Sequence, residues 1–94
     1  MRLSEPEKEH ILLAVRQFDA GARVFLFGSR ADDTKKGGDI DLLILSRSIG
    51  TREKQRIRGL ICDAVGDQRI DIVVASDAGN PLARIAQDTG VLLQ

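Results

Sequence analysis

Apolar residues recur at helical intervals in three segments of the chain. In the first segment, Ser4 and Glu7 have the spacing of a capping box, and the apolar residues that follow lie three or four positions apart. The third segment opens with an Asn-Pro pair, which is typical of a helix cap and first turn. A glycine follows each segment, and glycine commonly ends helices. We therefore predict three helices, bounded by Ser4 and Gly21, by Thr51 and Gly66, and by Asn80 and Gly90.

Short apolar runs rich in β-branched and aromatic residues lie between these helices, as is typical of buried strands. They cover residues 24–27, 40–45 and 70–75, and a further run at 91–93 fits an edge strand. The second and third runs are separated by a helix of crossover length, which predicts a βαβ unit. The order α-β-β-α-β-α-(β) indicates an α/β (α+β) fold with a small mixed sheet flanked by helices.

The bulk composition predicts one globular domain over residues 1–94. Fourteen acidic and fourteen basic residues leave no net charge, so no whole-molecule field attracts nucleic acid or anionic lipid. The chain has no apolar run of membrane-spanning length, and its acidic beginning lacks a signal-peptide pattern, so we expect a cytoplasmic protein without membrane contact. The single Cys62 excludes an internal disulfide and fits a buried or half-buried thiol.

Three aspartates interrupt strands that are otherwise apolar. Asp39 and Asp41 are two positions apart, so their side chains point to the same side while Ile40 points to the opposite one. Their mutual repulsion favours a bound cation, and hard divalent ions such as Mg²⁺ prefer oxygen ligands. Asp71 is the acid of the third strand, and the three carboxylates converge if the two strands are neighbours. Such a trio can hold two metal ions, as in phosphoryl- or nucleotidyl-transfer enzymes.

A glycine-serine turn follows the first predicted strand. Gly28 allows close approach of the backbone, and Ser29 offers a hydroxyl and a backbone N–H to a phosphate. Each feature has a plainer reading when it is taken alone: Asp-x-Asp occurs by chance, glycine ends many strands, and Asp71 can form an ion pair with Arg69. The order and spacing of the features together point to a catalytic site.

The segment GSRADDTKKGGDIDLLIL resembles the signature of the polymerase-β-type nucleotidyltransferase superfamily, especially its minimal nucleotidyltransferases (MNT). The leading helix, the segment RIDIVVAS and the tail PLARIAQDTGVLL are also similar to that group, so the resemblance covers most of the chain. It implies the nucleotidyltransferase fold. One departure is Gly38, which stands where many members have serine before the first aspartate.

The resemblance also implies roles for residues that match the motif. Asp39 and Asp41 would bind two Mg²⁺ ions, for which Mn²⁺ can substitute, and Asp71 would complete the catalytic metal site and help to deprotonate the acceptor hydroxyl. Ser29 and the backbone of Gly28 would hold the β- and γ-phosphates of a nucleotide such as ATP. Arg30 would either contact phosphate or brace the loop.

The acceptor of the nucleotide is not evident in the sequence. Its only aromatic residues, Phe18, Phe25 and Phe27, fall within predicted elements and form no base-stacking platform, which argues against nucleic acid. The chain ends soon after the predicted metal site, so we expect self-association or a partner protein to supply the acceptor site. Minimal nucleotidyltransferases commonly pair with a helical HEPN toxin, which they adenylylate as antitoxins. The basic stretch from Arg47 to Arg58 fits either a docking face or a solvated helix face.

Two alternatives to protein adenylylation stay open. The chain could be a catalytically silent module that neutralises its partner by binding, or a small-molecule transferase that modifies an antibiotic.

Overall fold

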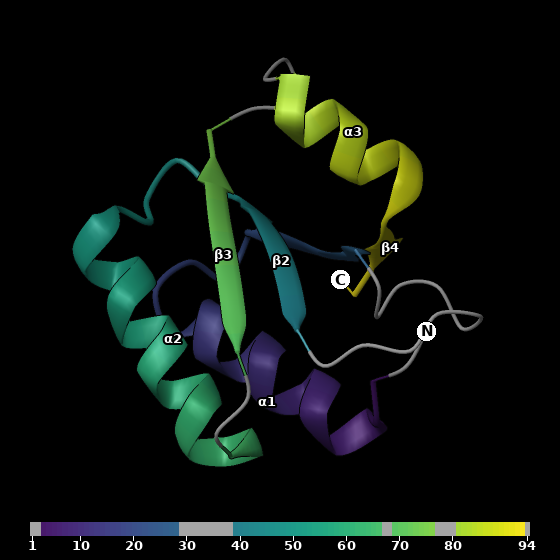
Figure 1. The fold of residues 1–94 in the computed structure, drawn as a ribbon. Helices are drawn as coiled ribbons and strands as arrows, with labels where there is room; N and C mark the ends of the chain where they lie inside the picture. The colour runs from purple at the N-terminus through teal and green to yellow at the C-terminus, as the bar shows by residue number, and fades with distance from the viewer. Residues whose placement is uncertain (1–2, 29–38, 67–68, 77–80, 94) are drawn as a thin grey trace.

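The computed structural model describes residues 3–28, 39–66, 69–76 and 81–93 and has the element order that the apolar pattern predicts (Figure 1). The elements in the described residues are α1 (Glu5–Arg16), β1 (Arg23–Phe27), β2 (Ile40–Leu45), α2 (Thr51–Val65), β3 (Ile70–Ala75), α3 (Pro81–Thr89) and β4 (Val91–Leu92). The bounds of β3 match the predicted run, and β4 confirms the short final strand.

The four strands form one mixed sheet in the order β3-β2-β1-β4. β1 pairs antiparallel with both β2 and β4, whereas β2 and β3 pair in parallel through the α2 crossover. The predicted βαβ unit is therefore confirmed, and its two strands are direct neighbours.

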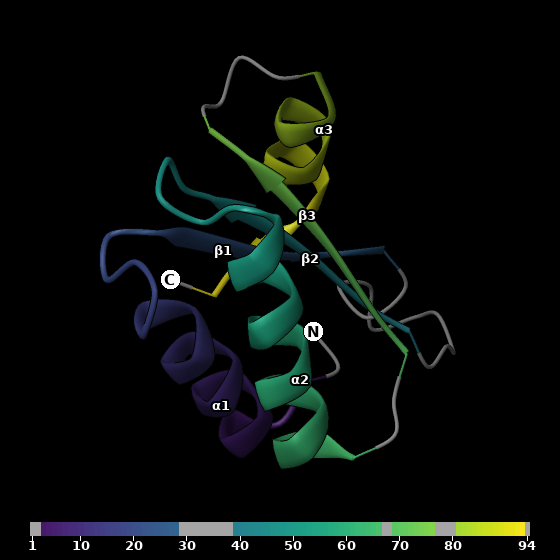
Figure 2. The ribbon, with the colours of Figure 1, turned by 90° about the vertical axis from the view of Figure 1, so that its left-hand side faces the viewer.

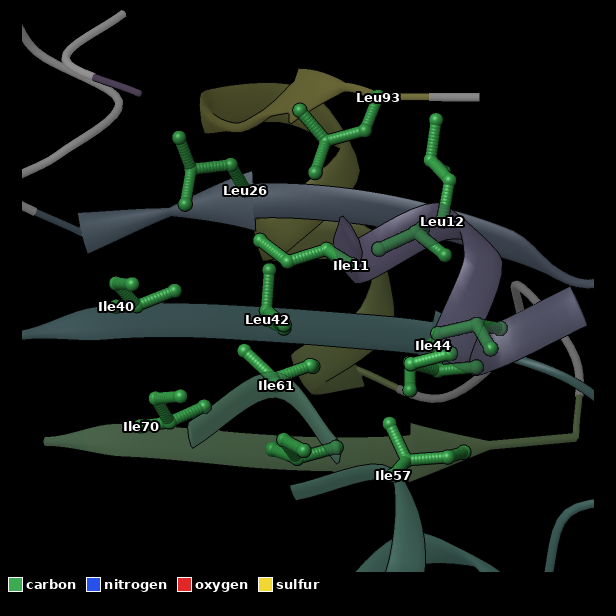
Figure 3. Close-up of a cluster of buried hydrophobic side chains, with 14 of the residues drawn as sticks. Ile11, Leu12, Leu26, Ile40, Leu42, Ile44, Ile57, Ile61, Ile70 and Leu93 are labelled. Atoms are coloured by element: carbon green, nitrogen blue, oxygen red, sulfur yellow. The ribbon is translucent and has the colours of Figure 1, made fainter. Parts of the chain in front are cut away.

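Helices cover both faces of this sheet. α1 and α2 lie together on one face and α3 lies on the other (Figure 2). The first face holds the larger core, in which Ile11 of α1 and Ile57 and Ile61 of α2 pack against the strands (Figure 3). These three isoleucines have no exposed surface, and burial of each contributes roughly 1.5–3 kcal/mol. On the other face, the buried Phe25, Leu43 and Ala75 form a smaller cluster. No described helix is both long and apolar enough to cross a membrane.

Helix α1 begins as predicted but ends earlier. Ser4 Oγ accepts a hydrogen bond from the backbone N–H of Glu7 at 3.2 Å, and Glu7 Oε1 accepts one from the backbone N–H of Ser4 at 3.0 Å, which completes the capping box. The helix stops at Arg16, so the prediction that it continues to Gly21, with Phe18 inside it, was wrong. The carboxylate of Asp19 accepts a hydrogen bond from the N–H of Gly21, and this local turn competes with further helix.

Helix α2 differs from its prediction by one residue at its start. Gly50 is the N-cap and Thr51 is the first helical residue, because Glu53 Oε1 accepts a hydrogen bond from the N–H of Gly50 at 2.8 Å. The predicted end is confirmed, since Gly66 has a φ of 90°, which is readily adopted only by glycine.

A buried serine ties together two turns at the carboxyl end of β2. Ser46 Oγ donates a hydrogen bond of 2.5 Å to Asp19 Oδ2 in the turn after α1. The same oxygen accepts hydrogen bonds of 3.1 Å from the backbone N–H groups of Ser48 and Ile49. Because Ser46 is buried, this hydroxyl satisfies polar groups that water reaches poorly.

We therefore expect Ser46→Ala to lower the free energy of unfolding by about 1–3 kcal/mol, because the change leaves polar groups without a partner. Urea denaturation followed by circular dichroism measures this loss. The matched control is Ser48→Ala, because the exposed Ser48 contributes its backbone N–H to the network; we expect a change of no more than about 0.5 kcal/mol. Equal effects of the two variants would contradict the assignment.

Candidate active site

The sheet register places two of the predicted acids side by side. Asp41 of β2 is the register partner of Asp71 in β3, just as Ile40 is the partner of Ile70. Partners in a sheet share a face, and Ile40 and Ile70 are fully buried beneath α1 and α2. The Asp41 and Asp71 side chains therefore belong to the opposite face, at the end of the sheet where β2 and β3 begin. Asp39, which is half-buried, directly precedes β2 at this end.

The electrostatics of Asp41 show that the acids act on one another. Partial burial raises the pKa of the Asp41 carboxyl above its usual value of 3.8, and the negative charges of Asp71 and then Asp39 raise it further. The positive charge of Arg69 has the opposite, smaller effect on the same pKa. Asp41 is therefore a half-buried carboxylate whose negative charge is incompletely balanced by the described residues.

Gly28 lies directly against this carboxylate. It follows β1, whose last residue, Phe27, is the antiparallel register partner of Asp41. Gly28 has a φ of 77°, and a Cβ atom built on it would collide with Asp41 Oδ2 and lie 3.2 Å from Asp41 Cγ. Both the backbone conformation and the close approach of Asp41 therefore require glycine here. The sequence suggested only an approach of backbone to phosphate.

The other two predicted nucleotide-binding residues, Ser29 and Arg30, lie outside the described residues. Their role in holding phosphate stays a prediction. Two further residues are away from the acids: His10 is exposed on α1, and Cys62 is half-buried against the larger core, as its sequence pattern indicated.

The donor atoms at this end of the sheet suit a hard divalent cation. Asp39, Asp41 and Asp71 offer only carboxylate oxygens, the ligands that Mg²⁺ and Mn²⁺ prefer. In the described parts of the chain, no three acidic, histidine or cysteine residues are gathered closely enough to form a finished metal-binding group. The three acids thus lie on one face and affect one another's charge, but their carboxylates are not gathered around a single metal position.

Arg69 lies beside the acids, although the sequence motif did not assign it to the site. The sequence offered it only as an ion-pair partner of Asp71; in the structure its positive charge acts to lower the pKa of Asp41. The available signal was the spacing of Arg69, Ile70 and Asp71, because alternation along a strand sends the first and third side chains to the same face.

A mixed sheet with helices on both faces, carrying carboxylates on adjacent parallel strands beside Gly28, is consistent with the nucleotidyltransferase fold. The family model of the nucleotidyltransferase domain matches residues 8–93. The chain therefore belongs to the nucleotidyltransferase domain family, which supports nucleotidyl transfer as its general activity. A search of curated proteins found no match.

The contact between Gly28 and Asp41 predicts a specific effect of Gly28→Ala. The variant should lose about 1–3 kcal/mol of stability through backbone strain and should also displace the Asp41 carboxylate, so that Mg²⁺ no longer raises the melting temperature. Gly66→Ala is the matched control, because Gly66 also has a positive φ but has nothing within 4 Å of an added Cβ. We expect that control to lose stability and keep its response to Mg²⁺, measured by thermal unfolding with and without the metal. A full response in Gly28→Ala would contradict the positioning of Asp41 by Gly28.

The raised pKa of Asp41 predicts the pH dependence of stability without metal. The folded state holds the Asp41 proton more tightly than the unfolded state does, so the destabilising effect of its charge is absent well below pH 3.8 and grows as the pH rises through the folded-state pKa. Asp41→Asn should therefore raise the free energy of unfolding at pH 7 in chelator and abolish stabilisation by Mg²⁺. Urea denaturation between pH 4 and pH 8 tests this, with Asp63→Asn, an exposed acid of α2, as control. Lower stability of Asp41→Asn at pH 7 would count against the argument.

Proposed function

We propose that this protein is a Mg²⁺-dependent nucleotidyltransferase that transfers AMP from ATP to a hydroxyl group on a partner protein. The observation that supports this most is the register pairing of Asp41 with Asp71 on the face that Gly28 approaches. Membership of the nucleotidyltransferase domain family supports the same class of reaction.

Each acid has a defined task in this proposal. Asp39 and Asp41 hold two Mg²⁺ ions, and Asp71 completes the site of one of them. The bound metal supplies charge neutralisation for the triphosphate and lowers the pKa of the acceptor hydroxyl. Asp71 takes the hydroxyl proton while the acceptor oxygen bonds to the α-phosphorus of ATP. The bond from that phosphorus to the β-phosphate bridging oxygen breaks, and pyrophosphate leaves.

The position of Asp71 favours a large acceptor. Asp71 is exposed, and β3 is an edge strand of the sheet formed by the described residues. A hydroxyl on the surface of another protein can approach such an open edge without entering a deep pocket. The resemblance to minimal nucleotidyltransferases suggests a helical HEPN-type partner, with the protein acting as its antitoxin.

The basic residues of α2 have a separate place in the fold. Arg52, Arg56 and Arg58 are exposed in the first half of the helix. Because α2 follows the carboxyl end of β2, this half begins at the end of the sheet opposite to the acids. Any contact with a partner there would serve docking and not chemistry. Arg56 also lies over the Phe18 ring, 5.9 Å from its centre, which gives it a structural contact.

A second candidate function is neutralisation of the partner by binding alone. The observation in its favour is that the acids form no finished metal-binding group in the described residues. The double variant Asp39→Asn, Asp41→Asn separates the two functions, since a silent binding module keeps its neutralising effect when both carboxylates are removed.

Transfer can be measured directly with α-³²P-labelled ATP, Mg²⁺ and a HEPN-type partner. We expect label on the partner protein with the wild-type chain and a loss of at least about 100-fold in rate with Asp71→Asn, because the variant lacks the base and a metal ligand. Asp63→Asn serves as the control for loss of one exposed acid and should keep the wild-type rate. Undiminished transfer by Asp71→Asn would sink the mechanism.

A further inference from the structure

The backbone of Arg69 is held at the end of the sheet that carries the acids. Its carbonyl oxygen accepts a hydrogen bond of 2.9 Å from the N–H of Ile40, the first residue of β2. Arg69 thus lies beside the start of β2 and two positions before Asp71. The Ile70 side chain between them is fully buried in the larger core. Alternation along the chain therefore directs the exposed Arg69 side chain to the face of the carboxylates.

The electrostatic effect of Arg69 agrees with this position. Its positive charge favours the ionised form of Asp41, against the effects of burial and of the two neighbouring acids. Without metal, a guanidinium at this place offsets part of the repulsion within the acidic trio. Arg69 remains exposed, so it is not locked into a buried ion pair and its side chain is free to reach another anion.

Binding of divalent cations would reverse the balance of charge around Arg69. Two Mg²⁺ ions carry more positive charge than the three aspartates carry negative charge, so the guanidinium would then be repelled from the loaded trio. The nearest incoming anion is the polyphosphate of the nucleotide. A guanidinium presents a planar fork of donors that matches two phosphate oxygens.

We propose that Arg69 is a nucleotide-binding residue whose guanidinium contacts a phosphate oxygen of the metal-bound nucleoside triphosphate. This inference rests on the proposed function, because it assumes that the trio binds metal and nucleotide. It adds to that function a phosphate contact from the β3 side of the site, across the sheet end from Gly28.

This phosphate contact predicts opposite effects of Arg69 on the binding of metal and of nucleotide. In Arg69→Gln, Mn²⁺ alone should bind about threefold more tightly, because a cation that repels it is gone. A non-hydrolysable ATP analogue should bind the Mn²⁺-saturated variant about tenfold more weakly, because a charged hydrogen-bond donor to phosphate is lost. Arg69→Lys keeps the charge and loses the fork, so its Mn²⁺ affinity should equal that of wild type while its affinity for the analogue is intermediate. Isothermal titration calorimetry measures both affinities.

The matched control is Arg52→Gln, an exposed arginine in the first turn of α2, and both of its affinities should equal those of wild type. A lower melting temperature with equal weakening of Mn²⁺ and analogue in both Arg69 variants would show a structural role and overturn the inference. Unchanged affinities in Arg69→Gln, with wild type binding both ligands, would overturn this inference alone and leave the proposed function standing. Absence of Mn²⁺ and analogue binding in wild type would overturn the proposed function together with the inference.

Discussion

The site depends on the register of the parallel pair β2 and β3. This register places Ile40 beside Ile70 in the core and, one residue further on, Asp41 beside Asp71 on the other face. A slip of one residue would turn one strand over and drive an aspartate into the core. Burial of the two isoleucines contributes roughly 1.5–3 kcal/mol each and resists that slip. Apolar packing on one face of the sheet thus holds two mutually repelling carboxylates together on the other.

The two ends of β2 differ in role: the carboxyl end contributes to stability, and the amino end carries the candidate site. At its carboxyl end, Ser46 joins the turn after α1 to the turn before α2 through short hydrogen bonds to satisfied partners. At its amino end, Asp41 is half-buried and its charge is incompletely balanced. A strand that is hydrogen-bonded at one end and packed along its length can hold an unfavourably placed charge at the other end.

The sequence was sufficient for the elements because their signals are local. Alternating and continuous apolar runs located the strands, and Gly66 located the end of α2. The end of α1 was misplaced because Asp19 captures the Gly21 N–H, a side-chain effect that apolar periodicity does not contain.

Only part of the site could be predicted in the same way. Alternation put Asp39 and Asp41 on one face, but their proximity to Asp71 depends on strand order, which no local pattern encodes. The contact of Gly28 with Asp41 likewise depends on antiparallel pairing between β1 and β2. Arg69 was not recognised as part of the site, because the effect of its charge on Asp41 depends on the pairing of β2 with β3.

The unfavourable environment of Asp41 is what would make a cation bind well. A carboxylate with a raised pKa is destabilising when charged, and a divalent ion that neutralises it recovers that free energy on binding. Gly28 preserves the effect, because a larger residue there would push the carboxylate away from its neighbours. Arg69 limits the effect, because its positive charge partly offsets the repulsion before any ligand arrives. The same repulsion between the acids that costs stability without a ligand would therefore favour cation binding. Asp71 is exposed on β3, an edge strand of the sheet formed by the described residues.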